Sequence, residues 1–268
     1  MTNIILSPHF DDAVLSLGGL VAAQVGRVIV ATLFAGAPPR PVRGLWDLCC
    51  GFRDSDQAMQ VRMRENENSL LACGIPSTDI RNYAYLDYQY RRASTMCADL
   101  SQDLQQMIRR DVGVLLEECS GTAVKLFAPG LEIHPDHALV KQAVLASRSA
   151  GRGNVVDVFL YQDLPYSFAV LRGGKRKLET LEAEIGRGTP PLQRQVVALS
   201  PEHFHTKLEA VKHHASQLRA LAIGTKLKTA KLGLFRKDLL EILRQHAAMQ
   251  ARCVGLPQGY CEIVYRLG

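Results

Sequence analysis

The sequence predicts an α/β fold of the Rossmann-like type, with a mostly parallel sheet flanked by helices and a C-terminal helical extension. In the first half of the chain, short β-branched runs alternate with segments of helical periodicity, which is the pattern of βαβ units. The 268 residues are 47% hydrophobic and 22% charged, a composition typical of a globular domain. No apolar run reaches the ~18–20 residues of a membrane-spanning helix, so we do not expect an integral membrane protein.

The first expected strand is a short β-branched run over residues 3–6. A helix rich in alanine, leucine and valine follows over 12–24, and Gly26 ends it. Residues 27–33, R-V-I-V-A-T-L, form the clearest buried strand. This order of strand, helix and strand is the first βαβ unit.

Residues 35–53 contain several prolines and the only tryptophan, so we expect a long loop there. Asp54 or Ser55 then caps a helix that runs to Cys73, where Gly74 stops it. The remaining expected elements are strands at residues 81–86, 124–128, 155–161 and 259–267, and helices at residues 100–121, 135–147 and 204–222.

The domain expectation is one domain over residues 1–268. A Rossmann-like catalytic core would occupy 1–160, and a C-terminal extension over 161–268 would complete the site.

The charge is moderately basic, with 32 lysines and arginines against 26 aspartates and glutamates. This balance suits an anionic substrate or membrane surface, but nucleic-acid binders concentrate basic charge more strongly. We therefore expect no nucleic-acid partner. Two basic segments, 172–177 and 226–237, are typical of solvated loops, with contact to an anionic ligand as the alternative.

The seven cysteines include no C-x-x-C pair, and the N-terminus carries no basic, apolar leader. Both features favour reduced thiols and a cytoplasmic location.

The strongest chemical signal is Pro8-His9-Phe10-Asp11-Asp12, where the first strand gives way to a helix. In a doubly wound sheet, ligands bind outside the carboxyl ends of the strands, and imidazole and carboxylate are good zinc ligands. His9 and Asp12 can reach the same side of this junction. Taken alone, the two aspartates are more readily explained as a helix cap and a favourable charge at a helix N-terminus.

A second cluster, His134-Pro135-Asp136-His137, also follows a strand and begins a helix. His137 could complete a His-Asp-His set with the first cluster and leave a fourth position open, as catalytic zinc sites do. A proline in the first helical turn beside polar capping residues is the alternative. Two such clusters at one sheet edge are hard to obtain by accident, so together they predict a metal centre.

These motifs resemble those of the LmbE-like, or PIG-L, N-acetylglucosaminyl deacetylases, a family of zinc amidases with a Rossmann-like fold. The family pattern has P/A-H-x-D-D after the first strand and H-x-D-H over a hundred residues later, and both occur here in that order. The segments R-M-R-E at 62–65 and K-L-E-A-V-K-H-H-A-S-Q at 207–217 resemble further family segments. The resemblance is close over residues 1–160 and patchy beyond them.

The resemblance implies that His9, Asp12 and His137 hold the metal. The expected ion is zinc (Zn²⁺), although ferrous iron (Fe²⁺) suits the same ligand set.

The resemblance also implies the division of the chemistry. Asp11 would be the general base on the metal-activated water, because something must accept the proton of that water. A protonated His134 would stabilise the oxyanion, with Asp136 as the partner that orients it and favours its charge.

Arg62 and Asp87 are the candidate substrate contacts. Asp87 lies in Y-L-D-Y-Q-Y-R, which resembles a family segment that offers an aspartate to the sugar but looks shorter here. An ordinary turn aspartate is the alternative. Arg62 could bind a substrate hydroxyl or phosphate, or form a helix-surface salt bridge with Glu65.

The expected activity is removal of the N-acetyl group from an N-acetylated amino sugar or its glycoside, possibly phosphate- or nucleotide-linked. One alternative is an amidase acting on a longer N-acyl chain or a thiol conjugate. Another is a non-catalytic sugar- or nucleotide-binding module on the same fold, which the presence of both Asp11 and His134 argues against. The sequence does not identify the sugar or its aglycone, and it does not determine whether the protein is a homo-oligomer.

Overall fold

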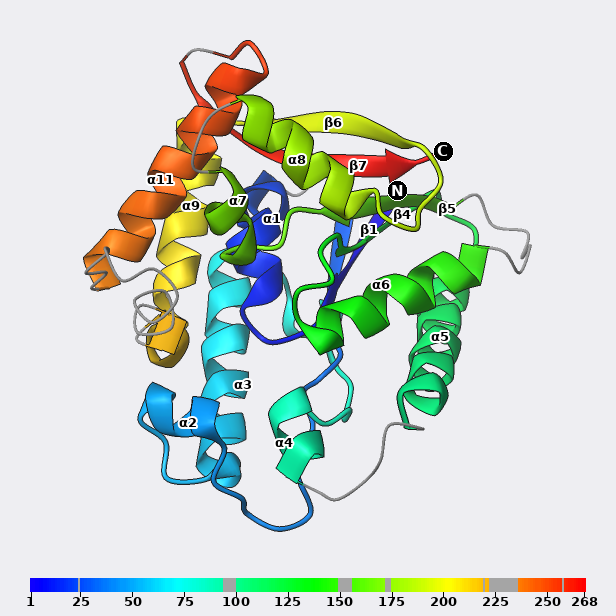
Figure 1. The fold of residues 1–268 in the computed structure, drawn as a ribbon, viewed down its shortest axis with the longest axis vertical. Coiled ribbons are helices and arrows are strands. Elements are labelled where there is room, and N and C mark those ends of the chain that lie inside the picture. The colour runs from blue at the N-terminus through cyan, green and yellow to red at the C-terminus, as the bar shows by residue number, and fades with distance from the viewer. Residues whose placement is uncertain are drawn as a thin grey trace.

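The computed structural model is built around a seven-stranded sheet with the order β3-β2-β1-β4-β5-β7-β6 (Figure 1). The pairs β3-β2, β2-β1, β1-β4 and β4-β5 are parallel, whereas β5-β7 and β7-β6 are antiparallel. The parallel part has the strand order of a doubly wound fold, which reverses between β1 and β4. The predicted fold class is therefore confirmed.

The structure describes residues 1–23, 25–93, 100–148, 156–171, 175–218, 220–221, 236–256 and 258–268. The strands are β1 (Thr2–Ser7), β2 (Arg27–Thr32), β3 (Ile80–Asn82), β4 (Val124–Pro129), β5 (Val156–Tyr161), β6 (Leu192–Leu199) and β7 (Tyr260–Leu267). The helices are α1 (Asp12–Ala23), α2 (Leu45–Cys50), α3 (Ser55–Ala72), α4 (Tyr88–Ala93), α5 (Leu100–Glu118), α6 (Pro135–Arg148), α7 (Tyr166–Leu171), α8 (Lys175–Ile185), α9 (Pro201–Lys212) and α11 (Arg236–Cys253).

The central strand β1 is buried along its whole length. Its side chains alternate between two hydrophobic layers, as the two-residue period of a strand requires. Ile4 and Leu6 pack in the layer that contains apolar residues of α5 and α6. Ile5 packs in the other layer, with α1, α9 and α11 (Figure 1). The sheet is therefore covered on both faces, and its carboxyl edge remains available for polar side chains.

The segment predicted as the loop 35–53 contains the short helix α2. Gly51 ends α2 in the left-handed conformation, with φ 87°, a backbone geometry that glycine adopts at low cost. The prolines around α2 hid this helix in the sequence.

The apolar stripe predicted as one helix over 204–222 is interrupted. The helix α9 ends at Lys212, a turn follows at His213, and a short helical segment resumes at 215–218. His214 and Leu218 stay buried across the break, so the buried stripe continues although the helix does not. Residues 219 and 222–224 lie outside the described part of the chain.

The C-terminal extension is not only helical, because β6 and β7 add two strands to the sheet. The strand β7 was expected, but β6 was not. It is an edge strand with partly exposed polar residues, including Gln193, Arg194 and Gln195, and so it lacks the apolar run that predicts a buried strand.

Among the described residues, no helix is both long and apolar enough to cross a membrane. The six cysteines of the described part form no disulfide. The side chains of the basic segments 172–177 and 226–237 lie outside the described residues.

Candidate active site

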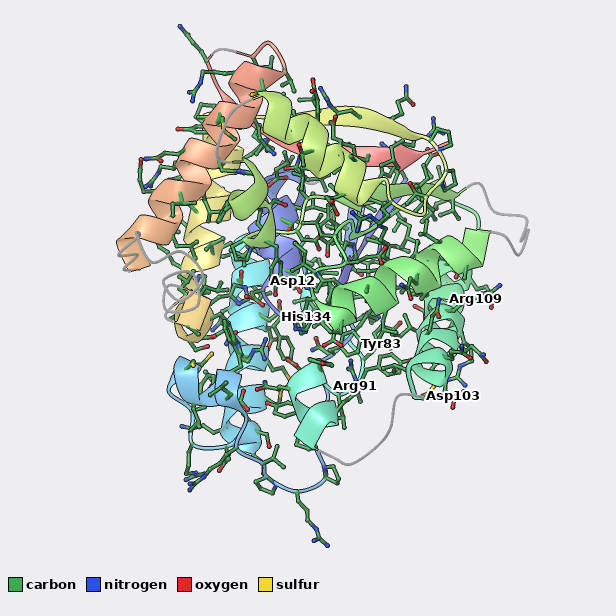
Figure 2. The ribbon with its side chains drawn as sticks, in the orientation of Figure 1. Asp12, Tyr83, Arg91, Asp103, Arg109 and His134 are labelled. Atoms are coloured by element: carbon green, nitrogen blue, oxygen red, sulfur yellow. The ribbon has the colours of Figure 1, made fainter. Side chains whose placement is uncertain are left out.

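The two motifs meet where the strand order reverses, at the carboxyl ends of the parallel neighbours β1 and β4. Figure 2 shows the labelled Asp12 and His134 at the centre of the molecule, beside this edge. The turn after β1 is organised by Ser7, whose hydroxyl donates to His9 O at 2.5 Å and accepts from Ala13 N at 3.0 Å. These bonds start α1 at Asp12 and turn the first motif toward the second.

Asp12 joins the two motifs. Its Oδ2 accepts a hydrogen bond from His9 N at 2.8 Å and lies 3.2 Å from His9 Nδ1. The same oxygen lies 3.2 Å from His137 Nε2. All three side chains are buried, so the three predicted metal ligands converge on one point.

The far nitrogen of each imidazole meets a second carboxylate. His9 Nε2 lies 3.0 Å from Asp136 Oδ2, and His137 Nδ1 lies 2.7 Å from Asp163 Oδ1. Carboxylates in this position orient metal-binding histidines and fix their tautomers. The structure thus gives the Asp136 carboxylate to His9, and leaves it 4.0 Å from its expected partner His134.

The donor set fits a divalent metal ion. His137 Nε2 is buried and has no hydrogen-bond partner among the described residues, although it faces Asp12 across 3.2 Å. A bound cation would satisfy such an orphaned lone pair. Two ligand atoms at zinc-bonding distance and the tetrahedral angle lie about 3.3 Å apart, close to the separations of Asp12 Oδ2 from the two imidazoles.

His134 lies at the same centre. Nitrogen atoms of His9, His134 and His137 fall within 4.8 Å of one another, so His134 is a fourth candidate ligand by proximity. Its side chain is 26% exposed, against 10% for His9 and 1% for His137. It is therefore the imidazole of the three that solvent and substrate reach most easily.

The structure favours a neutral His134. Burial and the charge of His9 lower the pKa of His134 to about 4, although the charge of Asp136 acts in the opposite direction. The Asp136 N–H donates to His134 Nδ1 at 3.2 Å, which places the proton of the neutral ring on Nε2. Burial and the charge of His9 therefore oppose the protonated form that the sequence analysis expects for His134.

Electrostatics separate the two adjacent aspartates. Burial, followed by repulsion from Asp12, raises the pKa of Asp11. Burial would also raise the pKa of Asp12, but His137 and His9 hold it well below its usual range. Asp12 is therefore the permanent anion and Asp11 the better proton acceptor.

Arg62 reaches both Asp11 and Asp87. Its guanidinium lies 4.0 Å from Asp11 Oδ1 and 3.6 Å from Asp87 Oδ2, and the residue is only 3% exposed. Glu65 bonds instead to Ser216, through the backbone N at 2.9 Å and Oγ at 2.6 Å. The alternative salt bridge between Arg62 and Glu65 does not form.

Asp87 is a turn aspartate with one carboxylate oxygen directed toward the other candidate site residues. Its Oδ1 accepts from Gln89 N at 3.0 Å, at the start of α4, as a turn aspartate does. Its Oδ2 faces the site, 3.8 Å from His9 Nε2 and 3.6 Å from Arg62 Nη1.

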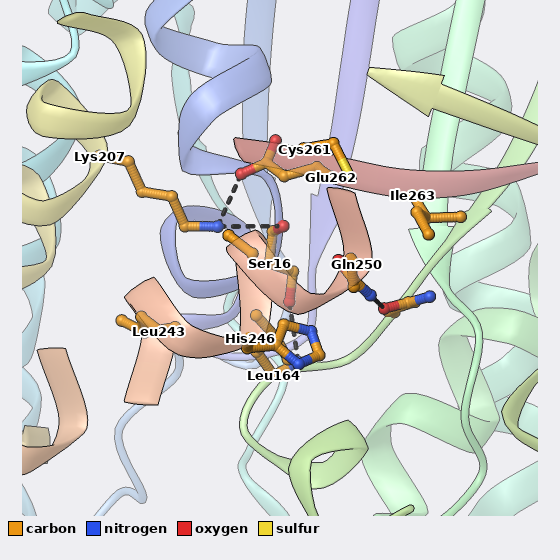
Figure 3. Close-up of a pocket in the computed structure, with 11 residues that line it drawn as sticks. Ser16, Leu164, Lys207, Leu243, His246, Gln250, Cys261, Glu262 and Ile263 are labelled. Carbon is orange, nitrogen blue, oxygen red and sulfur yellow. Dashed lines mark hydrogen bonds and ion pairs between the residues drawn. The ribbon is translucent and has the colours of Figure 1, made fainter. Parts of the chain in front are cut away.

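The helix α1 that follows the first motif is held by the C-terminal third of the chain. It is kinked at Leu17, with φ −124° and ψ 18°. Beyond the kink, the Glu262 carboxylate accepts from Gly19 N and from the next backbone N–H, both at 2.8 Å. Lys207 Nζ donates to Glu262 Oε1 at 2.6 Å and to Ser16 O at 3.4 Å (Figure 3). A buried ion pair from α9 and β7 thus replaces the backbone bonds that the kink interrupts.

Sequence reasoning missed three residues that surround the candidate metal ligands. Asp163 supports His137, Arg91 pairs with Asp136, and Tyr166 stacks edge-on against His137 with ring centroids 5.3 Å apart. The sequence contains only a weak indication of Asp163. It is an acidic residue that follows the buried strand β5, in the same way as the first motif follows β1.

Comparison with known proteins points to one kind of chemistry. Residues 4–147 match the PIG-L family, described as GlcNAc-PI de-N-acetylase. The probable N-acetyl-alpha-D-glucosaminyl L-malate deacetylase 2 of Bacillus anthracis is 27% identical over 214 residues, 80% of this chain and 80% of that protein. The zinc-inhibited form of teicoplanin deacetylase has 26% identity and a TM-score of 0.75 over 100% of this chain and 98% of that one. The A40926 pseudoaglycone deacetylase has 25% identity and a TM-score of 0.71, covering 99% of this chain and 96% of that one.

Proposed function

Since the chain belongs to the PIG-L family and is an N-deacetylase, we propose that its substrate is an N-acetylated amino sugar or its glycoside and that its metal is zinc. The observation that carries the metal assignment is the position of Asp12 Oδ2, 3.2 Å from both His9 Nδ1 and His137 Nε2. His9, Asp12 and His137 would hold the ion, through two nitrogens and one carboxylate oxygen, a set that zinc accepts.

The metal and Asp11 would share the activation of water. A divalent ion supplies Lewis acidity, which polarises the amide carbonyl and lowers the pKa of a water molecule. Asp11 accepts the proton of the attacking water and returns it to the leaving nitrogen. Arg62 approaches the Asp11 carboxylate only to 4.0 Å, which is beyond hydrogen-bond distance, so this contact does not prevent Asp11 from accepting a proton.

His134 would stabilise the oxyanion as a neutral donor. The Asp136 N–H occupies its Nδ1, so Nε2–H is available to the oxygen on which negative charge develops. Asp136 then acts mainly on His9, and reaches His134 through its backbone.

Arg62 and Asp87 would bind the sugar hydroxyls. The guanidinium donates and the carboxylate accepts, and their separation of 3.6 Å allows both to reach one ring. Because Arg62 already faces two carboxylates, this pair suits a neutral sugar better than a phosphate.

We also propose that residues 161–268 complete a single catalytic domain with the core. This rests on the contacts of Asp163 and Tyr166 with His137, and on the Lys207–Glu262 pair that holds α1.

Release of acetate from a panel of N-acetylhexosamines tests the substrate proposal. The zinc-loaded protein should release acetate and a primary amine in equal amounts from at least one free, glycosidic or nucleotide-linked member. The Asp11→Asn variant, loaded with the same metal, is the matched control. Faster release of a long fatty acid from the N-acyl analogue than of acetate would instead identify an amidase for longer chains.

A further inference from the structure

Asp163 is buried at 1% exposure and receives three hydrogen bonds. Its Oδ1 lies 2.7 Å from His137 Nδ1. Its Oδ2 accepts from Gly130 N at 2.9 Å and from Leu131 N at 2.6 Å. The two backbone N–H groups donate to this carboxylate, and an ionised carboxylate only accepts hydrogen bonds, so His137 Nδ1–H is the donor of the third.

This arrangement decides where a neutral His137 carries its proton. An acceptor at Nδ1 requires the proton to be on Nδ1, and a neutral imidazole has only one. The lone pair then lies on Nε2, the atom that faces Asp12 at 3.2 Å and has no hydrogen-bond partner among the described residues.

We propose that Asp163 is a positioning residue that fixes the Nδ1–H tautomer and the ring orientation of His137, so that Nε2 is presented to the metal. The inference rests on the proposed function, but it concerns a residue beyond 4–147, the segment that matches the family. It also explains how the segment after β5 takes part in a site built from the ends of β1 and β4.

The hydrogen bonds from Gly130 N and Leu131 N to Asp163 allow its effect on His137 to be tested separately from a purely structural role. Asp163→Asn keeps the size of the side chain and can keep an oxygen toward Gly130 and Leu131. Its amide NH₂ group then faces His137 Nδ1, which must become an acceptor. The proton moves to Nε2, the position that the metal requires.

The experiment measures zinc affinity of the stripped protein by competition with a chromophoric chelator. It is combined with the visible absorption spectrum of the cobalt(II) form and with urea unfolding of the metal-free protein. Asp163→Asn should bind zinc about 10–100-fold more weakly and should change the cobalt spectrum, since the ligand geometry changes.

Glu262→Gln is the matched control, because Glu262 is also buried and also accepts two backbone N–H bonds. It should lower the free energy of unfolding while leaving zinc affinity and the cobalt spectrum as in the wild type. If Asp163→Asn matches this control in all three measurements, Asp163 is structural only and the inference fails. If the wild type itself binds no metal, the proposed function fails instead.

Discussion

Asp12 Oδ2 lies 3.2 Å from His137 Nε2, although the two residues belong to different strand–helix units. They meet because β1 and β4 are parallel neighbours, so that their carboxyl ends lie at the same edge of the sheet. This contact links the two motifs through Asp12, and the adjacent Asp11 faces Arg62 instead.

Exchange of each aspartate for asparagine should separate metal binding from catalysis. Asp12→Asn replaces an anionic ligand oxygen with a neutral one and should lower zinc content. Asp11→Asn should keep the metal and lower kcat by about 10²–10⁴-fold with little change in KM, because a general base is lost. Elemental analysis beside steady-state kinetics checks both variants. An empty site in Asp11→Asn with a full site in Asp12→Asn would reverse the two roles.

Arg62→Ala should affect neutral and phosphorylated substrates to a similar extent. Its guanidinium is already shared between Asp11 and Asp87, so little positive charge is left for a phosphate. Because Arg62 lowers the pKa of Asp11, the acid limb of kcat/KM should also move to higher pH in the variant. A pH profile with each substrate measures both effects. A KM that rises only for the phosphorylated substrate would show that Arg62 binds the phosphate.

The Lys207–Glu262 pair should contribute to stability as a unit. Both side chains are nearly fully buried and their charged atoms lie 2.6 Å apart. Lys207→Met leaves an uncompensated buried carboxylate and should cost about 3–5 kcal/mol. Lys207→Met combined with Glu262→Gln should cost less than the sum of the single changes. Urea unfolding of the four proteins measures the coupling, and strict additivity would show that the two groups act independently.

His246 should make the protein less stable in mild acid. Burial, followed by the charge of Lys207, lowers the pKa of His246 to about 3. The residue lines a small cavity to which Lys207 and Glu262 also contribute (Figure 3). In the unfolded chain the His246 imidazole takes up a proton below pH about 6.5, whereas in the native state it does so only near pH 3. The free energy of unfolding is therefore highest above pH 6.5 and decreases as the pH falls toward 3.

Between pH 7.5 and 5, His246 should therefore account for a loss of about 2 kcal/mol. Chemical unfolding at both pH values measures this loss, which His246→Gln should remove. His205→Gln, at an exposed position of α9, serves as the matched control. Equal losses in the wild type and in His246→Gln would contradict the assignment.

The βαβ core was predictable because its signals are local. Apolar runs with turn residues at their ends marked β1, β2, β4 and β5, and a loose alternation marked β7. Both motifs follow such apolar runs. The strand β6 was not predictable in the same way, since polar residues such as Arg194 face solvent at the sheet edge.

Spacing along the sequence did not reveal which side chains contact the site residues, because these are tertiary contacts. The sequence paired Asp136 with its neighbour His134, but the fold brings His9 closer. The salt bridge between Arg62 and Glu65 was one of two alternatives for Arg62, and in the fold Arg62 is buried and faces Asp11 and Asp87 instead.

Zinc reconstitution followed by acetate release tests the central claim most directly. The protein is stripped of metal with a chelator and titrated with zinc up to one equivalent, while bound zinc and acetate release from an N-acetylated amino sugar are measured together. The rate should be negligible in the stripped protein and should rise in proportion to occupancy, and the His137→Ala variant should show neither binding nor activity. An undiminished rate in the stripped protein, or in His137→Ala, would contradict a metal-dependent deacetylase built on His9, Asp12 and His137.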